Sequence, residues 1–491
     1  MPLSKSKYTR GLQCHKSLWL YQHKPELRTP PDAAAQARMD AGTAVGELAQ
    51  ELFPGGKEIE FDPNNFPKML GLTKQYLEDG VKTIYEASFS RANVFVACDI
   101  LHHGHQGWEL YEVKSSSKVK DYHGHDVAVQ WYVLEKAGIK PVKAAIVHIN
   151  TAYVREGDLD INQLFTIEDV TEETIYRQTS IPANLEAMKV MLKEEEPEMR
   201  IGLQCTNPFD CDFMDYCWQE VPEQSVFNLY NLRGDKKFNL YHSGIRTLDD
   251  IPMDLKLNAV QQLQLSAHRA KAPLIDTGVI EDFLEQITEP AYYLDFETFQ
   301  HAVPRFDGQR PYEHIPFQYS LHIEQAGQLT HKEYLADEMS DPRRGLAEKL
   351  IEDLKGEGTI IAFNMGFEKR VITGLSKQFT DLANELNALN LRFIDLVVPF
   401  RQGGYYDEKM NGSFSIKAIL PALFPDDPEL SYKNLSIQDG NAASGIFANL
   451  YKNTDEDQVE RIREGLLAYC KLDTLAMVKI VNFLRDLLKG A

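Results

Sequence analysis

The sequence predicts an α/β fold made of two separate cores joined by a small helical region. Three short apolar runs within residues 83–117, a helical stretch at 123–138 and an apolar run at 143–150 indicate one compact set of strands and helices. A second alternation of strands and helices begins after Pro290 and closes with a long helical stretch at about 455–488. The two alternations are the observations on which the predicted fold class depends.

The length of the chain agrees with this division. A chain of 491 residues has the length of about three folded units. We expect a first domain at residues 1–220, a helical connector at 221–289 and a second domain at 290–491. Within the connector, residues 236–252 resemble a helical hairpin with Gly244 in its turn, a motif that can grip a DNA backbone or simply pack as two helices.

Composition and charge restrict the classes of function. The chain has 52 basic and 73 acidic residues, a net charge of −21, whereas a passive phosphate-binding protein is usually basic. Metal-dependent nucleases need carboxylates, and their bound cations supply much of the charge that faces phosphate. The sequence shows neither an apolar run long enough to span a bilayer nor the apolar core of a signal peptide. We therefore expect a cytoplasmic protein without a membrane partner.

Two acids and a lysine stand on the second and third predicted strands. Asp99 precedes the turn at residues 103–107, and Glu112 and Lys114 follow that turn. Side chains repeat their direction every second residue along a strand, so Glu112 and Lys114 share a face. Two carboxylates can hold a divalent metal, and a lysine beside them can orient or deprotonate water and stabilise developing charge. The pattern predicts a hydrolytic metal site, although most isolated sets of this kind are surface ion pairs.

An apolar strand at residues 291–299 carries two further acids. In the run AYYLDFETF, Asp295 and Glu297 lie on one face of a strand that is otherwise apolar. Unpaired buried charge is very costly, so carboxylates in such a strand indicate a cation nearby.

Two later segments carry the rest of this set. The run TIIAFNMGFEKRVI is a strand that ends near Asn364 and leads into a helix containing Glu368. In AYCKLDTLAM, Tyr469 and Asp473 are four residues apart and therefore lie on one helical face. Four acids on three separate elements indicate a second metal site.

The first 220 residues resemble RecB-like nucleases of the PD-(D/E)XK superfamily, which have a restriction-endonuclease-like core. The resemblance is strongest to CRISPR-associated and AddB-type nucleases with an iron–sulfur cluster, because one cysteine precedes the core and three follow it. These cysteines are Cys14, Cys205, Cys211 and Cys217. The resemblance implies that Asp99 and Glu112 bind metal, that Lys114 is catalytic and that the four thiolates hold a [4Fe–4S] cluster. A structural Zn²⁺ is the alternative that the same ligand set suits.

The supporting motifs of this family are altered. Gly46 stands where the relatives carry a histidine, and Glu47 follows it as a substitute ligand candidate. The usual Gln-x-x-x-Tyr helix motif is reduced to Gln130 and Tyr132 at another spacing. Glu47 and Gln130 are therefore accessory candidates only.

Residues 290–491 resemble the DnaQ-like 3′–5′ exonucleases, which have a ribonuclease H-like core. The implied ligands of two Mg²⁺ or Mn²⁺ ions are Asp295, Glu297, Glu368 and Asp473. Tyr469 would orient the attacking water, as in the DEDDy branch, and Asn364 is an accessory candidate. Glu368 stands where the family has aspartate, and its extra methylene moves the carboxylate by more than ~1 Å.

Together the two resemblances predict a metal-dependent nuclease of a bacterial two-nuclease family. We expect a DNA exonuclease acting in repair or mobile-element defence, with DNA favoured over RNA as its partner. Two alternatives stay open. In the first alternative, only the C-terminal core is active, on RNA or DNA. In the second, both acidic sets are relics in a non-catalytic nucleic-acid-binding adaptor. The altered motifs and the acidic total favour these alternatives, whereas the intact acids and Lys114 favour the nuclease. The sequence does not define the oligomeric state.

Overall fold

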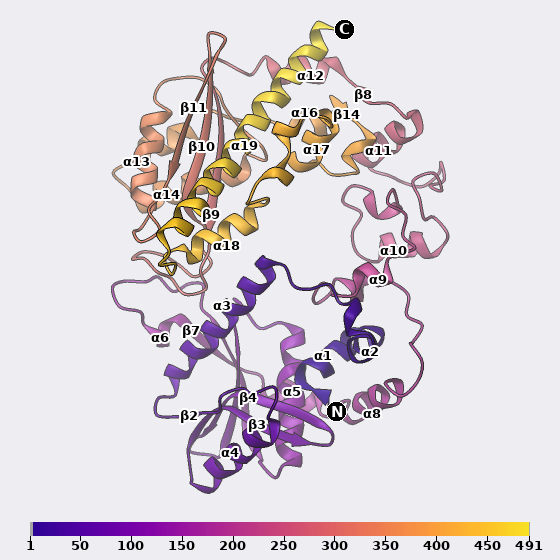
Figure 1. Cartoon of the computed structure of the whole chain (residues 1–491), viewed down its shortest axis with the longest axis vertical. Helices are drawn as coiled ribbons and strands as arrows, with labels where there is room; N and C mark the ends of the chain where they lie inside the picture. Colours follow the sequence, from indigo (N-terminus) through magenta and orange to yellow (C-terminus); the bar gives the residue numbers. More distant parts are fainter. Residues whose placement is uncertain (1–2, 491) are drawn as a thin grey trace. The chain divides into compact units, whose positions relative to one another are not determined.

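A computed structural model describes residues 3–490, which form two compact units of mixed α/β structure (Figure 1). Unit 1 comprises Met1–Glu220 and His301–Tyr312, and unit 2 comprises Val221–Gln300 and Glu313–Ala491. Residues 221–289, expected as a connector, therefore belong to unit 2. Among the described residues, no helix combines the length and the apolar character that crossing a membrane requires.

The described part of unit 1 is built on a seven-stranded mixed sheet in the order β2-β3-β4-β5-β6-β7, with β1 beside β4. Its strands are β1 (Leu3–Ser4), β2 (Lys57–Glu58), β3 (Thr83–Arg91), β4 (Val94–His103), β5 (Trp108–Lys114), β6 (Pro141–Ile149) and β7 (Phe165–Asp169). The strands β3, β4 and β5 form an antiparallel meander, as their alternating patterns predicted. Strand β6 runs parallel to β5, so the chain must cross over between them, and it does so through a helix.

Helices cover both faces of this sheet. They are α1 (Lys5–Gln13), α2 (His15–His23), α3 (Ala33–Ala49), α4 (Phe66–Glu78), α5 (Asp121–Lys136), α6 (Ile161–Leu164), α7 (Thr171–Arg177), α8 (Ile181–Met191) and α9 (Met214–Cys217), with single turns η1 (Pro25–Leu27), η2 (Gln50–Leu52) and η3 (Leu203–Cys205). The crossover helix α5 buries Val127 and Trp131 in one core, and α3 buries Val45 and Ala49 in a second core. Helices α1 and α2 are separated at Cys14, whose backbone is extended and whose thiol caps α2 by accepting the N–H of Ser17.

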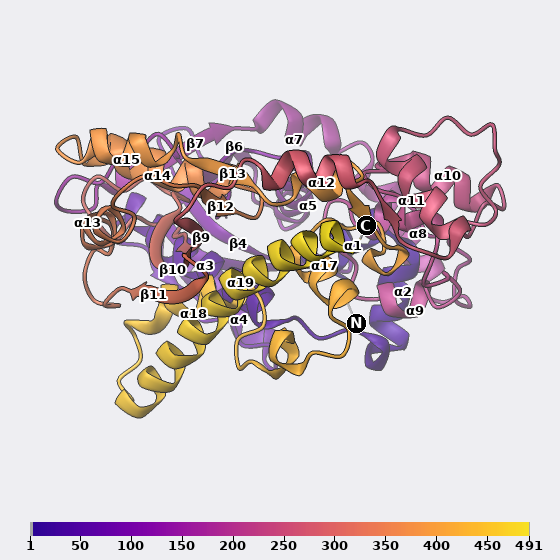
Figure 2. The same cartoon turned by 90° about the horizontal axis from the view of Figure 1, so that it is seen from above.

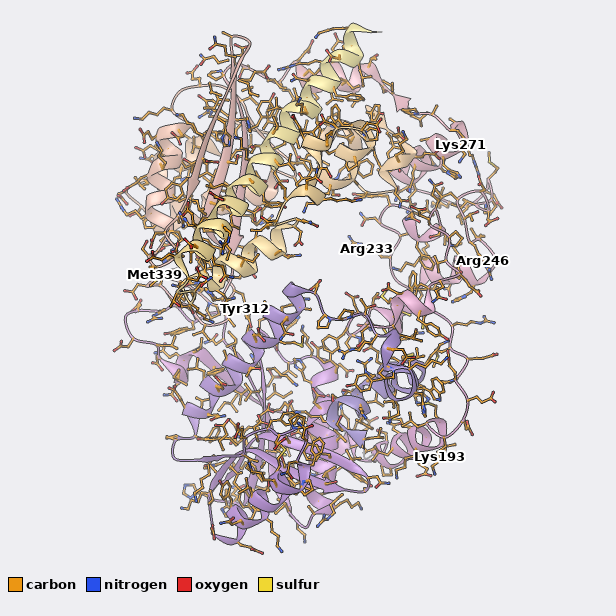
Figure 3. The ribbon with its side chains drawn as sticks, in the orientation of Figure 1. Lys193, Arg233, Arg246, Lys271, Tyr312 and Met339 are labelled. Carbon is orange, nitrogen blue, oxygen red and sulfur yellow. The ribbon has the colours of Figure 1, made fainter. Side chains whose placement is uncertain are left out.

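A strap at His301–Tyr312 completes unit 1, although it lies between two strands of unit 2 in the sequence. Its Gly308 N–H donates to the carbonyl of Arg155 at 2.7 Å, and the Arg155 N–H donates to the carbonyl of Gln309 at 3.1 Å. Tyr312, labelled in Figure 3, donates its hydroxyl to the carbonyl of Ser115 at 2.5 Å. The strap therefore ends beside the residue that follows Lys114.

Within the described residues, unit 2 contains a five-stranded sheet in the order β11-β10-β9-β12-β13 and a two-stranded sheet of β14 and β8. The strands are β8 (Leu274–Ile275), β9 (Ala291–Phe299), β10 (Ile315–Gln325), β11 (Gln328–Leu335), β12 (Ile360–Ala362), β13 (Phe393–Asp395) and β14 (Tyr405–Tyr406). The strands β9, β10 and β11 are antiparallel, and β12 and β13 run parallel to β9. The polar edge strand β11 was not expected, because its exposed side chains lack an apolar alternation.

The described part of unit 2 contains helices that pack on the larger sheet and others that lie away from it. They are α10 (Asp235–His242), α11 (Ala259–Ala270), α12 (Thr277–Leu284), α13 (Arg343–Asp353), α14 (Gly366–Gln378), α15 (Ala383–Leu389), α16 (Val398–Arg401), α17 (Ile416–Leu423), α18 (Gly440–Leu450) and α19 (Glu456–Lys489), with turns η4 (Val226–Asn228), η5 (Glu408–Met410), η6 (Pro428–Leu430) and η7 (Tyr432–Asn434). The helices α13, α14 and α15 share a core with Tyr292, Leu294 and Phe296 of β9. The long helix α19 runs along β9 and β10 (Figure 2).

The helical hairpin expected around Gly244 does not form. Helix α10 ends at His242, Gly244 adopts a left-handed backbone with φ +98°, and the next helix begins only at Ala259. The Asp250 carboxylate explains the difference, because it accepts the N–H groups of Arg246 at 3.1 Å and Thr247 at 2.8 Å. These bonds close a loop where the second helix was expected.

Two buried polar contacts fix α19 against β10. The side-chain amide of Gln318 donates to the carbonyl of Leu466 at 2.9 Å. About two turns further along, Thr474 Oγ1 lies 2.7 Å from Ser320 Oγ and 2.8 Å from His322 Nδ1. Buried polar groups of this kind rarely lack partners, so the two contacts define the register of the helix on the strand.

Replacing Thr474 with valine tests this anchor. The Thr474→Val substitution keeps the shape of the side chain but removes the hydroxyl that contacts Ser320 and His322. Ser320 keeps its contact with His331 at 2.9 Å, whereas His322 Nδ1 loses its contact, so we expect the free energy of unfolding to fall by about 1 to 3 kcal/mol. Thr474→Ser keeps the hydroxyl and should lose only about 1 kcal/mol for one methyl group. Urea denaturation of the full chain measures both. If the Thr474→Val protein is as stable as the wild type, Thr474 does not anchor α19 to β10.

Candidate metal sites

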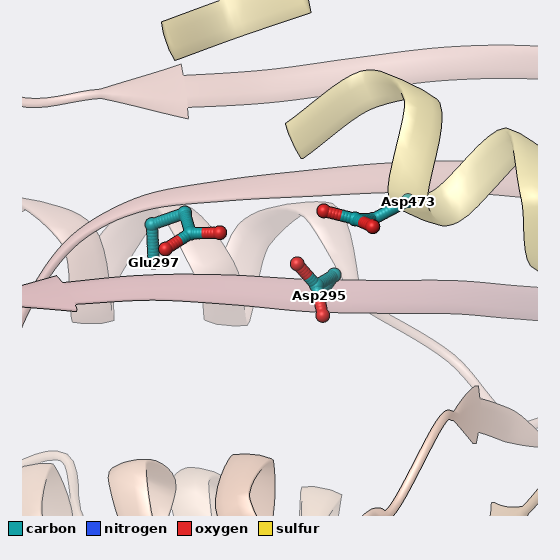
Figure 4. Close-up of side chains that lie close together, drawn as sticks. All are labelled: Asp295, Glu297 and Asp473. Carbon is teal, nitrogen blue, oxygen red and sulfur yellow. The ribbon is translucent and has the colours of Figure 1, made fainter. Parts of the chain in front are cut away.

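Three acids of unit 2 converge where α19 passes β9. Asp295 and Glu297 project from the same face of β9, and Asp473 faces them from α19 (Figure 4). Each offers a carboxylate oxygen, and these three oxygens lie within 4.8 Å of one another. The opposite face of β9 is apolar, so the strand places its two acids on the side of α19. The structure thus brings together three of the four acids that the sequence indicated.

The proximity of these acids is electrostatically unfavourable without a cation. Burial raises the pKa of Asp295 well above its usual range, and the charges of Asp473, Glu297 and Glu368 add to the effect. Burial likewise raises the pKa of Glu297, and that of Asp473 to about 6. Two unit charges about 5 Å apart repel by roughly 3 kcal/mol at an effective dielectric constant of ~20. A divalent cation between the three oxygens would remove this penalty.

Two tyrosines and a lysine border the three acids. The Tyr432 hydroxyl donates to Asp473 Oδ1 at 2.5 Å. Lys417 Nζ lies 5.0 Å from the ring centroids of both Tyr432 and Tyr469. Its positive charge partly offsets the rise in the pKa of Glu297 and Asp473. Tyr469, expected from the sequence, is buried beside these groups, and its pKa is raised by burial and by Asp473. Tyr432 was not expected, because its turn η7 carries no motif that links it to Asp473.

Glu368 lies near the three acids but outside their 4.8 Å group. It stands in the first turn of α14, only 3% exposed, and its Oε2 has no hydrogen-bond partner among the described residues. Burial and the charge of Asp395 raise its pKa to about 8. Asn364 begins this turn with a left-handed backbone (φ +63°), and its N–H donates to Asp395 Oδ1 at 2.9 Å. Asn364 and Asp395 therefore shape the turn that carries Glu368.

In unit 1, three acids lie side by side across neighbouring strands. Glu86 on β3 stands opposite Asp99 on β4. The neighbours of Glu86 along β3 pair with the neighbours of Asp99 along β4, which places these two acids across from each other. Asp99 lies one residue beyond the last pair of β4 with β5, which places it next to Glu112. Asp99 Oδ2 also accepts the N–H of Val113 at 2.7 Å. Cross-strand neighbours have Cβ atoms about 5 Å apart, and like charges in such positions are destabilising.

Positive groups surround Glu112, the most deeply buried of these acids at 1% exposure. Lys114 Nζ donates to Glu112 Oε1 at 2.7 Å and to Asp126 Oδ2 at 2.7 Å. Lys5 Nζ donates to Glu112 Oε1 at 2.9 Å and Oε2 at 3.0 Å. Burial would raise the pKa of Glu112, but the two lysines lower it to about 2. Glu112 and Lys114 are therefore both charged in the folded protein.

Unlike Glu112, the other two acids of this group, Asp99 and Glu86, have raised pKa values. Burial and the charge of Glu112 raise the pKa of Asp99 to about 6. Burial and the charge of Asp99 raise the pKa of Glu86 to about 7. Glu86 was not expected from the sequence, although an acid inside the apolar run TIYEASF is the same signal that identified Asp295. Its left-handed backbone (φ +55°) interrupts the regular pairing of β3.

The two accessory candidates of unit 1 have different outcomes. Gln130, on α5, donates its amide to Glu112 Oε2 at 2.6 Å, so the structure brings it to the site. Glu47, on α3, is exposed, and within residues 3–490 it makes no hydrogen bond or ion pair with Asp99 or Glu112. The structure thus places Glu86, and not Glu47, beside the acids of this site.

The four cysteines that the sequence grouped line one pocket of unit 1, and all four are free thiols. They are Cys14, Cys205, Cys211 and Cys217. Polar bonds hold the two ends of the unit together around them: Arg10 pairs with Asp212 at 2.6 Å, and the Gln13 amide donates to the carbonyl of Phe209 at 2.7 Å. Burial raises the pKa of the Cys217 thiol to about 11, so a bound metal would have to displace its proton. Four thiols are the ligand types of a [4Fe–4S] cluster or a Zn²⁺ ion, but among the described residues no three of these sulfurs lie within 4.8 Å of one another, as a single tetrahedral Zn²⁺ would need.

A family model and two relatives match parts of the chain. Residues 292–415 match a family described as a domain of unknown function, DUF2779. The match includes Asp295, Glu297 and Glu368 but ends before Asp473. The chain is 23% identical over 215 residues to the uncharacterized protein MG366 of Mycoplasma genitalium, covering 40% of this chain and 32% of that protein. It is 24% identical over 219 residues to the MG366 homolog of Mycoplasma pneumoniae, covering 41% and 33%. The chain therefore matches about a third of the length of each relative.

The pKa directions predict how pH controls metal binding. Asp473 titrates near 3.8 when unfolded and near 6 when folded, so its contribution to stability falls as pH rises between these values. A divalent ion binds the ionised acids, so we expect Mn²⁺ to raise the melting temperature more at pH 8 than at pH 5. Differential scanning calorimetry with and without Mn²⁺ measures this difference. It should shrink in a variant with Asp295→Asn and Asp473→Asn, and an Mn²⁺ effect independent of pH would contradict the assignment.

Proposed function

We propose that the protein is a metal-dependent nuclease whose principal site consists of Asp295, Glu297, Glu368, Asp473 and Tyr469. The observation that carries this proposal is the convergence of three buried carboxylates within 4.8 Å, with Glu368 close enough to raise the pKa of two of them. Hydrolysis of a phosphodiester by two metal ions needs several converging carboxylates. We infer DNA as the favoured substrate and Mg²⁺ or Mn²⁺ as the ions.

The strand order of unit 2 supports a ribonuclease H-like core. The first three strands of its five-stranded sheet, β9, β10 and β11, are antiparallel neighbours, and β12 and β13 are added in parallel on the other side of β9. This order is the one that the resemblance to DnaQ-like exonucleases implies. The acids also stand at the places that the resemblance implies, on the first strand, on the helix after β12 and on the last helix.

The arrangement of unit 1 supports a second, RecB-like core. Its antiparallel meander β3-β4-β5, crossover helix α5 and parallel strand β6 carry Asp99 on the second strand and Glu112 and Lys114 on the third. The raised pKa of Lys114 keeps its ammonium charged, which suits it to stabilise negative charge on a phosphate. The cysteine pocket would hold a [4Fe–4S] cluster, with Zn²⁺ as the alternative, and broad absorption near about 400 nm distinguishes the cluster.

The residues of the unit 2 site have separable roles in this proposal. When bound there, Mg²⁺ or Mn²⁺ would supply Lewis-acid activation of water and stabilisation of the leaving oxygen. Asp295, Glu297 and Asp473 would hold the ions, since their oxygens already converge. The Tyr469 hydroxyl would orient the attacking water, and the Tyr432 hydroxyl holds the Asp473 carboxylate in position at 2.5 Å.

A nuclease assay with site variants tests the function. We expect wild-type protein to degrade labelled single- or double-stranded DNA with Mg²⁺ or Mn²⁺, and Asp295→Asn to lower the rate of exonucleolytic release at least about 100-fold, since it removes a ligand of the ions. Lys114→Met should lower only the activity of the unit 1 site. Lys479→Met, a change on α19 outside both sites, is the matched control.

The assay also separates the alternatives. Activity that survives Lys114→Met but not Asp295→Asn would assign catalysis to unit 2 alone. The same variants tested on labelled RNA identify the preferred nucleic acid. If the wild-type protein binds DNA or RNA but cleaves neither with either ion, the nuclease proposal fails and a binding adaptor takes its place.

A further inference from the structure

Lys5 places an ammonium group on the acids of the unit 1 site. Its Nζ donates to both carboxylate oxygens of Glu112, at 2.9 and 3.0 Å, and lies 3.7 Å from Asp99 Oδ1. Lys5 is 107 residues from Glu112 in the sequence and was not expected in this site. A cation already stands at oxygens that a divalent ion would use.

The hydrogen bonds of Glu112 leave no free place for an additional cation. Oε1 accepts from Lys5 and from Lys114, and Oε2 accepts from Lys5 and from Gln130. A carboxylate offers about four lone-pair sites, so these four contacts use all of them. A divalent ion that coordinates Glu112 must therefore displace one of the three donors.

Of the three donors to Glu112, Lys5 is the one that can be displaced most easily, because it has the fewest other contacts. Lys114 keeps a second bond, to Asp126 at 2.7 Å, and Gln130 is fully buried and also donates to the carbonyl of Asp126 at 3.0 Å. In the part of the chain that the structure describes, the Lys5 ammonium contacts only Glu112 and Asp99, and its side chain is 23% exposed. Its flexible four-carbon stem can carry the charge toward solvent.

The backbone of Lys5 is fixed although its side chain can move. The preceding residues Leu3 and Ser4 pair with Val94 and Phe95 of β4, and Ser4 caps α1 by accepting the N–H of Lys7 at 3.2 Å. Displacement of the ammonium therefore needs only a change of side-chain rotamer. After displacement the group stays tethered near the site.

We propose that Lys5 is a tethered cation that competes with the divalent ion for Glu112 and Asp99 and so sets the metal concentration that the unit 1 site requires. This inference rests on the proposed function, since it needs unit 1 to bind a metal. Without the ion, Lys5 compensates the acids and keeps the site folded. Removing the ammonium should make metal binding tighter, whereas loss of an ordinary supporting residue would make it weaker.

The test is a Mn²⁺ titration of the full chain, in which electron paramagnetic resonance measures free Mn²⁺. Asp295→Asn and Asp473→Asn are present throughout, so that binding reports unit 1. We expect Lys5→Met to lower the Kd for Mn²⁺ about tenfold, because a charge-assisted contact to both oxygens is removed. Lys5→Arg keeps the charge and should bind Mn²⁺ as weakly as the parent, as should Lys7→Met, a matched lysine change on the same helix.

A second variant and a second measurement distinguish a change in Mn²⁺ affinity from misfolding of the variant. Lys5→Gln should also tighten binding, and in both neutral variants Mn²⁺ should raise the melting temperature by more than in the parent. An unchanged or higher Kd in folded Lys5→Met and Lys5→Gln proteins would overturn the competition while leaving the metal site intact. If the parent and both variants bind no Mn²⁺, the metal site of unit 1 fails as well.

Discussion

Repulsion between buried carboxylates is the constraint on which the account of both units depends. In unit 2, carboxylate oxygens of Asp295, Glu297 and Asp473 lie within 4.8 Å of one another; burial raises the pKa of all three, and repulsion by the other acids raises those of Asp295 and Glu297 further. A carboxylate out of water is stable only when it is paired, protonated or bound to a metal. The two units meet this requirement differently. Lys5 and Lys114 bond directly to Glu112 in unit 1, whereas in unit 2 the charge of Lys417 acts on the acids without a described bond to them. The acids of unit 2 are therefore the ones that most need an added cation.

The scaffold of unit 2 prevents the acids from relaxing apart. Gln318 and Thr474 fix α19 to β10, and β10 is paired with β9 along its length. Asp473 therefore cannot move away from Asp295 unless a buried polar contact is broken. A site held in place before its ligand arrives loses less freedom on binding, which suits both catalysis and metal affinity.

The sequence predicts the elements that carry the acids better than it predicts their partners. The strand with Asp295 and Glu297 and the helix with Asp473 follow from local periodicity, and the structure forms both. Glu86 carried a readable signal, an acid in an apolar strand, but only the pairing of β3 with β4 shows that it faces Asp99. Lys5 and Tyr432 carried no such signal, because their contacts cross 107 and 41 residues and depend on packing. The expected hairpin failed for a local reason, since Asp250 closes a loop that helical periodicity does not reveal.

The most direct test of the central claim is the position of bound metal. Crystals soaked in Mn²⁺ and measured at the manganese absorption edge should show anomalous density between Asp295, Glu297 and Asp473. Weaker density beside Asp99 and Glu112 should appear only where the Lys5 side chain has moved away. Crystals at saturating Mn²⁺ with no anomalous density between these three acids would contradict the account.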